Sequence, residues 1–175
     1  MRTRPSPRPV VSRVAVEVQV AGNESQLPEA SGITTWAEAV IQRMGEDPDA
    51  VDVCVRIVDE AESRQLNKNY RQKDKPTNVL SFTAELPAAL EAEMRAEAKN
   101  GQKLLGDIVI CDPVVRREAQ AQEKTVHDHY AHMVVHGMLH LYGLDHMDQA
   151  GADEMEDTER EILERFGIAD PYLAH

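Results

Sequence analysis

Six of the seven histidines of this 175-residue chain lie between positions 127 and 146. Within that stretch stands the sequence HGMLHLYGLDH, which begins at His136. His136 and His140 are four residues apart, so on a helix their imidazoles lie on one face, about one turn apart. Gly143 permits a left-handed turn that ends the helix and brings His146 back toward the same point. Three imidazoles leave one position of a tetrahedral metal ion open, which is typical of catalytic zinc.

We therefore expect His136, His140 and His146 to bind one metal ion per chain, in a site at the end of a long helix. Zinc is the expected metal, but imidazole also suits nickel, copper and iron, so another divalent ion stays open. A water molecule in the open position of such a site ionises near pH 7. The alternative is a hydrogen-bonded cluster of histidines without a metal.

Two neighbouring residues are candidates for supporting the metal ligands. His132 lies one turn before the first ligand on the same helix face, and a fourth ligand would close the site, so we interpret His132 as a supporting or core residue. Asp145 precedes His146 and either orients a ligand imidazole or is an ordinary turn residue. His127 and His129 fall in the first turn of the helix, where we expect them to be solvated or to act in capping.

The residue that follows His136 is a glycine, Gly137. Zinc peptidases with the HExxH motif carry a glutamate at that position as the general base. Peptide hydrolysis by that route is therefore not expected, and no other strong general base is evident in the sequence.

A group of basic residues stands out in an acidic chain. The chain has 31 Asp and Glu against 19 Lys and Arg, a formal charge of -12, which excludes nucleic-acid binding through overall charge. One short segment instead holds five basic residues and one acidic residue, namely Arg64, Lys68, Arg71, Lys73 and Lys75 with Asp74. This segment either binds phosphate groups or is a solvated helix end.

Hydrophobic patterns and capping residues predict the elements that position these side chains. Alternating residues predict strands over 10–20, 51–57, 79–83 and 104–111. Helices are expected to begin at a capping box of Thr35 with Glu38, at Asp59, at Asp112 before Pro113, at Thr125 with Asp128, and near Asp148. This order predicts an α+β fold with a four-stranded mixed sheet covered by about five helices.

The length fits a single domain over residues 1–175. Residues 84–103 are rich in Ala and Glu and are expected to form an exposed excursion, and residues 1–9 are expected to be flexible. No apolar run approaches the roughly 20 residues that cross a bilayer. The spacing of the two cysteines suits a reducing compartment, so we expect a soluble, cytoplasmic protein, with its oligomeric state open.

Three motifs together resemble the YbeY family of bacterial endoribonucleases. They are LNKNYRQKDKPTNVLSF, LLGDIVIC and HGMLHLYGLDH, which stand in the family's order within about residues 51–170. The resemblance implies a zincin-like fold, zinc on the three histidines, and Arg71 as a functionally important residue near the cleft. It also implies a single-strand-specific, metal-dependent endoribonuclease that acts in 16S ribosomal RNA 3′ end maturation and ribosome quality control.

The resulting hypothesis is that metal-activated water, or a metal-activated ribose 2′-hydroxyl, attacks an RNA phosphodiester. Arg71 then stabilises the developing charge, and Lys73 and Lys75 bind neighbouring phosphates. Single-stranded ribosomal RNA and the ribosome are the expected partners, and the acidic C-terminal helix is either a solubilising surface or a docking face for a basic ribosomal protein. The alternatives are a non-catalytic ribosome assembly factor with a structural metal and, less favoured, a zinc peptidase.

Overall fold

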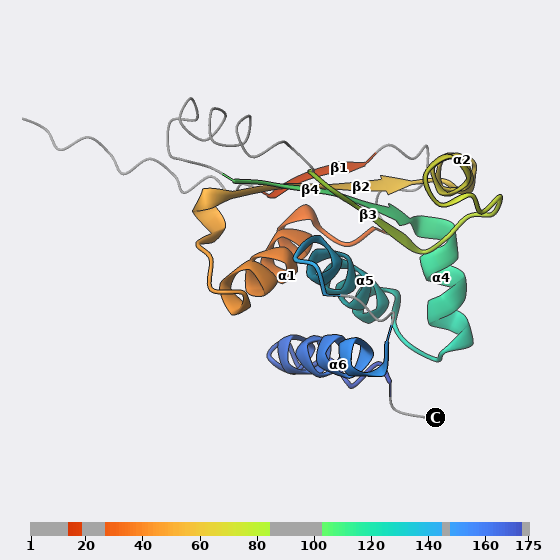
Figure 1. Ribbon diagram of the computed structural model, residues 1–175. Coiled ribbons are helices and arrows are strands. Elements are labelled where there is room, and N and C mark those ends of the chain that lie inside the picture. Colours follow the sequence, from red (N-terminus) through yellow and green to blue (C-terminus); the bar gives the residue numbers. More distant parts are fainter. Residues whose placement is uncertain (1–13, 19–26, 85–102, 145–147, 173–175) are drawn as a thin grey trace, which may run out of the picture.

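The structure is a computed structural model that describes residues 14–18, 27–84, 103–144 and 148–172 (Figure 1). The expected N-terminal arm, most of the expected excursion at 84–103, and both Asp145 and His146 lie outside these ranges. The described residues form an α+β fold in which helices cover a mixed sheet, as the sequence predicts.

Four strands form the sheet, in the order β1-β2-β4-β3. Their bounds are β1 (Val14–Val18), β2 (Val51–Val58), β3 (Val79–Thr83) and β4 (Lys103–Cys111). β2 runs parallel to both β1 and β4, whereas β3 pairs antiparallel with β4. The prediction of a four-stranded mixed sheet is confirmed, and β3 is an edge strand of the sheet within the described part of the chain.

Five α-helices of the described chain pack around this sheet. They are α1 (Ala30–Arg43), α2 (Glu60–Arg71), α4 (Asp112–Ala121), α5 (Val126–Leu141) and α6 (Gln149–Glu164), and a short 3₁₀ helix, Pro48–Ala50, precedes β2. α1 and α5 lie on one face of the sheet, and α6 lies beyond them (Figure 1). Leu66 of α2 packs on a separate small cluster of Val58, Leu80 and Val109. Among the described helices, none combines the length and apolarity needed to span a membrane.

The central helix α5 begins and ends as its sequence predicts. The Thr125 hydroxyl accepts a hydrogen bond from the Asp128 backbone amide at 3.1 Å, and Gly143, with a φ of 87°, follows the helix. Asp59 and Asp148 also cap their helices through their carboxylates, as predicted. A side-chain acceptor satisfies a backbone N–H that has no partner in the first helical turn.

The predicted start of the first helix is wrong. α1 begins at Ala30, and Thr35 lies inside it. The Thr35 hydroxyl donates a hydrogen bond to the carbonyl oxygen of Ser31 at 2.8 Å. Threonine makes this bond readily within a helix. The pattern that Thr35 forms with Glu38 therefore does not mark the start of the helix here.

The cap of α4 also differs from the prediction. Its N-cap residue is Cys111, and Asp112 is already the first residue of the helix. The Asp112 carboxylate instead accepts hydrogen bonds from the side chains of Arg116 and Tyr130. Its side chain therefore joins α4 to α5 through the Tyr130 hydroxyl.

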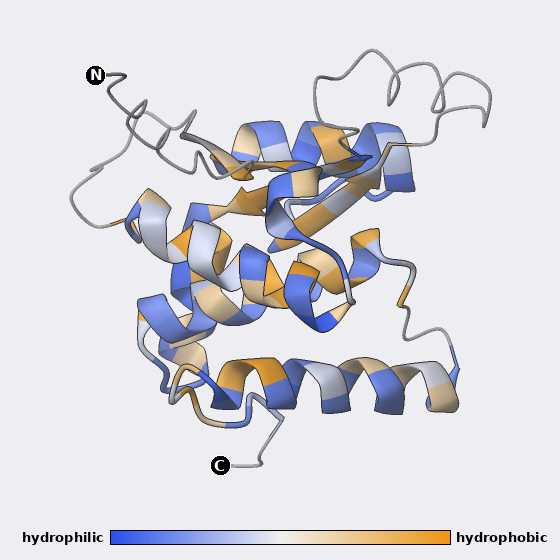
Figure 2. Ribbon diagram, turned by 90° about the vertical axis from the view of Figure 1, so that its left-hand side faces the viewer, coloured by the Kyte–Doolittle hydropathy of each residue, from blue (hydrophilic) through white to orange (hydrophobic). Residues whose placement is uncertain are grey.

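Burial along α6 follows an amphipathic pattern. Met155, Ile162 and Leu163 are buried, and hydrophilic residues alternate with them along the helix (Figure 2). One acidic residue, Glu159, is fully buried with these apolar side chains. A carboxylate in such a place needs hydrogen-bond partners, and two histidines of α5 and the Tyr172 hydroxyl supply them.

Gly106 in β4 is expected to be a sensitive position for stability. It has a φ of 148°, and a Cβ there would lie 2.2 Å from the backbone carbonyl oxygen of Phe82 on the paired strand. We expect Gly106→Ala to lower the free energy of unfolding by about 2 to 3 kcal/mol, through strain and a backbone clash. Urea denaturation measures this loss. Gly32→Ala, at a helical position with open space around it, is the control; equal losses in both variants would contradict the prediction.

Candidate active site

His136 and His140 approach each other on one face of α5, as their spacing predicts. Their Nε2 atoms are 3.1 Å apart. Both residues are half-buried and line the same cleft. Two imidazole nitrogens that bind one tetrahedral ion, with bonds of about 2.0 to 2.1 Å, lie about 3.3 Å from each other. The pair therefore fits a shared metal ion with little adjustment.

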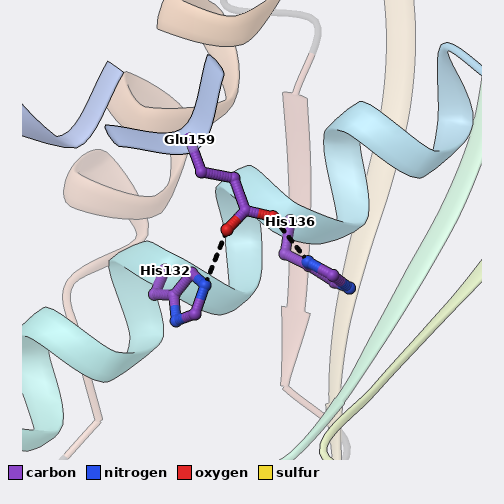
Figure 3. Close-up of side chains that lie close together, drawn as sticks. All are labelled: His132, His136 and Glu159. Carbon is purple, nitrogen blue, oxygen red and sulfur yellow. Dashed lines mark hydrogen bonds and ion pairs between the residues drawn. The ribbon is translucent and has the colours of Figure 1, made fainter. Parts of the chain in front are cut away.

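A buried carboxylate that the sequence analysis missed stands behind this pair. Glu159 of α6 places Oε1 2.7 Å from Nδ1 of His136 (Figure 3). Its Oε2 lies 2.9 Å from Nε2 of His132 and accepts a hydrogen bond from the Tyr172 hydroxyl at 2.5 Å. Because an ionised carboxylate only accepts, the proton of His136 stays on Nδ1. Its unprotonated Nε2 then carries the lone pair that can bind a metal.

The charge state of Glu159 follows from the same contacts. Burial acts to raise the pKa of this carboxyl, but hydrogen bonds and charge interactions with His132 and His136 outweigh burial and lower the pKa to about 2. Burial lowers the pKa of the His132 imidazole, against the opposing effect of Glu159. Glu159 is therefore ionised at neutral pH and able to hold the proton on His136.

The same residues form a second group with metal-binding atoms. Ligand atoms of His132, His136 and Glu159 lie within 4.8 Å of one another and could hold a metal ion. In this inner group the carboxylate already accepts direct hydrogen bonds from both imidazoles, and a cation would have to replace them. The pair of His136 and His140 instead faces an open cleft. A metal ion bound to this pair would also be accessible to a substrate. Imidazole donors of this kind suit zinc and several other divalent metals.

Gly137 faces the sheet. A Cβ on this residue would lie 3.0 Å from Cγ2 of Ile108 and 3.2 Å from Cγ2 of Val79. Its carbonyl oxygen accepts a hydrogen bond from the Ser81 hydroxyl at 2.9 Å. Glycine thus allows α5 to approach the sheet closely. Any side chain at this position would press against Ile108 and Val79 of the sheet. This position therefore faces the sheet and supplies no glutamate base of the HExxH type.

The cleft that contains the histidine pair extends to the end of α2. It has a volume of about 1210 Å³, and α2, β2, β3, β4 and α5 all contribute to its lining. Arg71, the last residue of α2, is exposed and lines it. The structure therefore brings Arg71 into one cleft with His136 and His140.

Side chains of α2 hold the loop that follows Arg71. The Asn67 amide donates a hydrogen bond to the Lys75 carbonyl oxygen at 2.8 Å. The Ser63 hydroxyl donates one to the Thr77 carbonyl oxygen at 3.0 Å. Both Ser63 and Asn67 are buried, so the contacts fix the end of the helix from which Arg71 enters the cleft.

The other basic residues of this segment are placed differently. The Arg64 guanidinium makes two hydrogen bonds to the Asp74 carboxylate, at 2.8 and 3.1 Å. Lys73 and Lys75 are exposed on the loop and do not belong to the described lining of the cleft. Their role in binding neighbouring phosphates stays a prediction, and it concerns the surface beside the cleft.

The two histidines of the first turn of α5 have different surroundings. His127 is exposed, with its ring edge-on to Trp36 at a centroid distance of 5.0 Å. His129 is buried, with Nε2 3.0 Å from Glu118, a carboxylate to which the Asn78 amide also donates. The expectation that His129 is solvated or caps the helix is wrong, because its side chain faces α4.

The third predicted ligand, His146, and its neighbour Asp145 lie outside the described residues. Their roles stay predictions. The helix before them ends at Leu141, and Gly143 takes the left-handed conformation that the proposed turn requires.

Comparisons with known proteins cover most of the chain. The family model described as Endoribonuclease YbeY matches residues 18–167. A protein of Halorhodospira halophila (strain DSM 244 / SL1) named Endoribonuclease YbeY is 51% identical over 153 residues, which cover 87% of this chain and 92% of that protein. The solution structure of TM1509 from Thermotoga maritima is 23% identical with a TM-score of 0.54, covers 92% of this chain and 99% of that one, and shows the fold alone. On the family match and this identity, the chain belongs to the YbeY family of endoribonucleases.

Proposed function

We propose that this protein is a metal-dependent endoribonuclease that cuts single-stranded RNA during ribosomal RNA maturation. The observation that carries the proposal is one cleft lined by His136, His140 and Arg71 in a chain of the YbeY family. A relative with 51% identity over most of both chains is named an endoribonuclease, which makes RNA the substrate class.

Each residue of the centre has a part that its chemistry supports. His136 and His140, together with His146, would hold one divalent ion, with zinc as the first candidate. When bound, such an ion supplies Lewis-acid stabilisation of the charge on a phosphodiester. Glu159 keeps the proton of His136 on Nδ1. The unprotonated Nε2 is then the atom that would bind the ion. The Arg71 guanidinium binds two phosphate oxygens and stabilises the charge that develops on them during attack.

The finer assignment rests on the family resemblance. From it we infer cleavage at the 3′ end of 16S ribosomal RNA, in the cytoplasm, and a part in ribosome quality control. The outer surface of α6 bears exposed acidic residues, namely Asp153, Glu154, Asp157, Glu161 and Glu164. Such a surface repels RNA and complements a basic ribosomal protein, which would bring the cleft to its substrate. A purely solubilising surface is the alternative.

Two other functions fit the site less well. A non-catalytic assembly factor with a structural metal needs neither an open cleft beside the ligands nor an arginine within it, and the cleft here has both. A zinc peptidase of the HExxH type needs a glutamate after His136, where this chain has Gly137 packed closely against the sheet.

Replacement of Arg71 tests the proposed function. We expect Arg71→Ala to lower kcat/KM on single-stranded RNA by about 100- to 1,000-fold, because one preorganised donor to a developing oxyanion contributes about that factor. Arg71→Lys should restore part of the loss, since lysine keeps the charge but not the two-pronged contact. Initial rates of purified, metal-loaded protein on labelled single-stranded RNA measure both effects.

Lys73→Ala is the matched control, because Lys73 lies on the same loop outside the described cleft lining. It should change kcat/KM by less than about tenfold, as expected of an exposed phosphate contact. Parallel reactions contain structured RNA or casein. Wild-type rates from Arg71→Ala, or casein cleavage by the wild type that His136→Ala abolishes, would contradict the proposed function.

A further inference from the structure

Tyr70 and Phe82 form an aromatic pair in the same cleft. Tyr70 directly precedes Arg71 at the end of α2, and Phe82 lies on the edge strand β3. Their rings meet edge to face, with centroids 5.0 Å apart and an angle of 65° between the planes. Both line the cleft that contains His136 and His140. No local sequence pattern marks either aromatic residue as a substrate contact.

Most of the surface of Tyr70 is exposed to solvent and not packed against the protein. Phe82 packs on the small hydrophobic cluster under α2 and so has a structural role. Tyr70 is 65% exposed, the highest value among the exposed large hydrophobic residues of the described chain, ahead of Leu104 at 46%. Only part of the ring therefore contacts Phe82, and the remainder is open to a ligand in the cleft.

The cleft suits a nucleic-acid strand in size and charge. Its volume of about 1210 Å³ exceeds the roughly 300 to 1,000 Å³ of ordinary small-molecule pockets. Two arginines, Arg56 and Arg71, and a single acid, Asp107, are the charged side chains of its described lining. The Arg56 guanidinium is ion-paired with the Glu62 carboxylate at 2.7 Å, so Arg71 is the cation on which the charge argument rests. An arginine beside an exposed aromatic ring is the combination by which proteins bind single strands.

We propose that Tyr70, supported by Phe82, stacks on a nucleobase of the RNA substrate while Arg71 binds an adjacent phosphate. This inference rests on the proposed function and adds a substrate contact to it. Every base has a flat π face, so the contact tolerates different sequences. Bases within a duplex are already stacked on one another, so the contact favours single-stranded RNA. A strand held at both its base and its phosphate would have a fixed position relative to the histidine pair.

The experiment compares Tyr70 variants of the full-length, metal-loaded protein. Tyr70→Ala should raise KM for single-stranded RNA, and Kd for a labelled single-stranded deoxyoligonucleotide, by about 5- to 100-fold. Tyr70→Leu keeps an apolar contact with Phe82 but cannot stack, so it should fold like the wild type and bind as weakly as Tyr70→Ala. Tyr70→Trp should keep wild-type values. Leu104→Ala is the control, because Leu104 is exposed and lies outside the described cleft lining.

An abasic strand identifies the contact as stacking. Without bases, the wild type and Tyr70→Leu should bind equally weakly. Wild-type KM and Kd in Tyr70→Leu, or a difference that persists on the abasic strand, overturn the inference. If Tyr70→Leu binds normally and RNA is still cut, the stacking contact fails and the proposed function stands. If the wild type binds through Tyr70 but cuts no RNA, the proposed function fails and the stacking contact stands.

Discussion

Replacing His140 with alanine is expected to lower RNA cleavage by at least about a thousandfold and to remove most of the bound metal. His140 supplies one of the two Nε2 atoms that meet at 3.1 Å in the cleft. A divalent ion contributes several kcal/mol to transition-state stabilisation, and each 1.36 kcal/mol is a factor of ten in rate. Cleavage rates on labelled single-stranded RNA and elemental analysis of the purified chains measure the two effects.

His127→Ala is the matched control for this variant. His127 lies on the same helix, but it is exposed and lies outside the described cleft lining. This control should retain both metal and activity. His140 is only half-buried at the end of α5, so His140→Ala should remain folded by circular dichroism. A folded His140→Ala protein with one metal ion per chain and wild-type cleavage would refute the assigned centre.

Removing the carboxylate of Glu159 is expected to weaken metal binding by about 10- to 100-fold and to destabilise the fold. Three groups use this carboxylate as their acceptor: His136 Nδ1 at 2.7 Å, His132 Nε2 at 2.9 Å and the Tyr172 hydroxyl at 2.5 Å. Glu159→Ala leaves these groups unsatisfied in the interior, and the loss of one partner from a buried charged network costs about 3 to 5 kcal/mol. Denaturant titration and competition with a metal chelator measure the two losses.

Glu159→Gln separates the two effects, because it keeps the side-chain volume and removes the charge. We expect a smaller loss of stability, of about 1 to 3 kcal/mol. Metal binding should weaken by the same factor as in Glu159→Ala, about 10- to 100-fold. Glu164→Gln, at an exposed position of the same helix, should change neither quantity. Wild-type metal affinity in Glu159→Gln would show that Glu159 does not orient His136.

Local sequence signals predicted most of the secondary structure. Asp59, Thr125 and Asp148 each accept a hydrogen bond from a backbone amide of the following helix. These interactions span three residues, so they depend little on the rest of the fold. The spacing of His136 and His140 was informative for the same reason, because helix geometry alone places residues four apart on one face.

The mistaken predictions concern side chains with several possible partners. The Thr35 hydroxyl bonds to a carbonyl within its helix, and the Asp112 carboxylate bonds to Tyr130 on another helix. His129 is buried because Glu118 of α4 offers it an acceptor. The choice among such partners depends on how the helices pack, which the local sequence does not contain.

Glu159 was missed because its partners are distant in the chain and its helix is acidic. A signal was nevertheless present, since Glu159 shares a helical face with Met155, Ile162 and Leu163, which are all buried. An acid at an apolar position of an amphipathic helix indicates a buried charge that needs partners. Tyr70 was missed because exposure and cleft geometry, which mark it, appear only in the structure.

Anomalous diffraction from a crystal of the zinc-loaded protein locates the metal itself. We expect one peak in the cleft, about 2.0 to 2.1 Å from Nε2 of both His136 and His140, with His136 Nδ1 still bonded to Glu159. A peak enclosed by His132, His136 and Glu159, or two imidazoles that turn away from each other in the presence of the metal, would contradict this expectation.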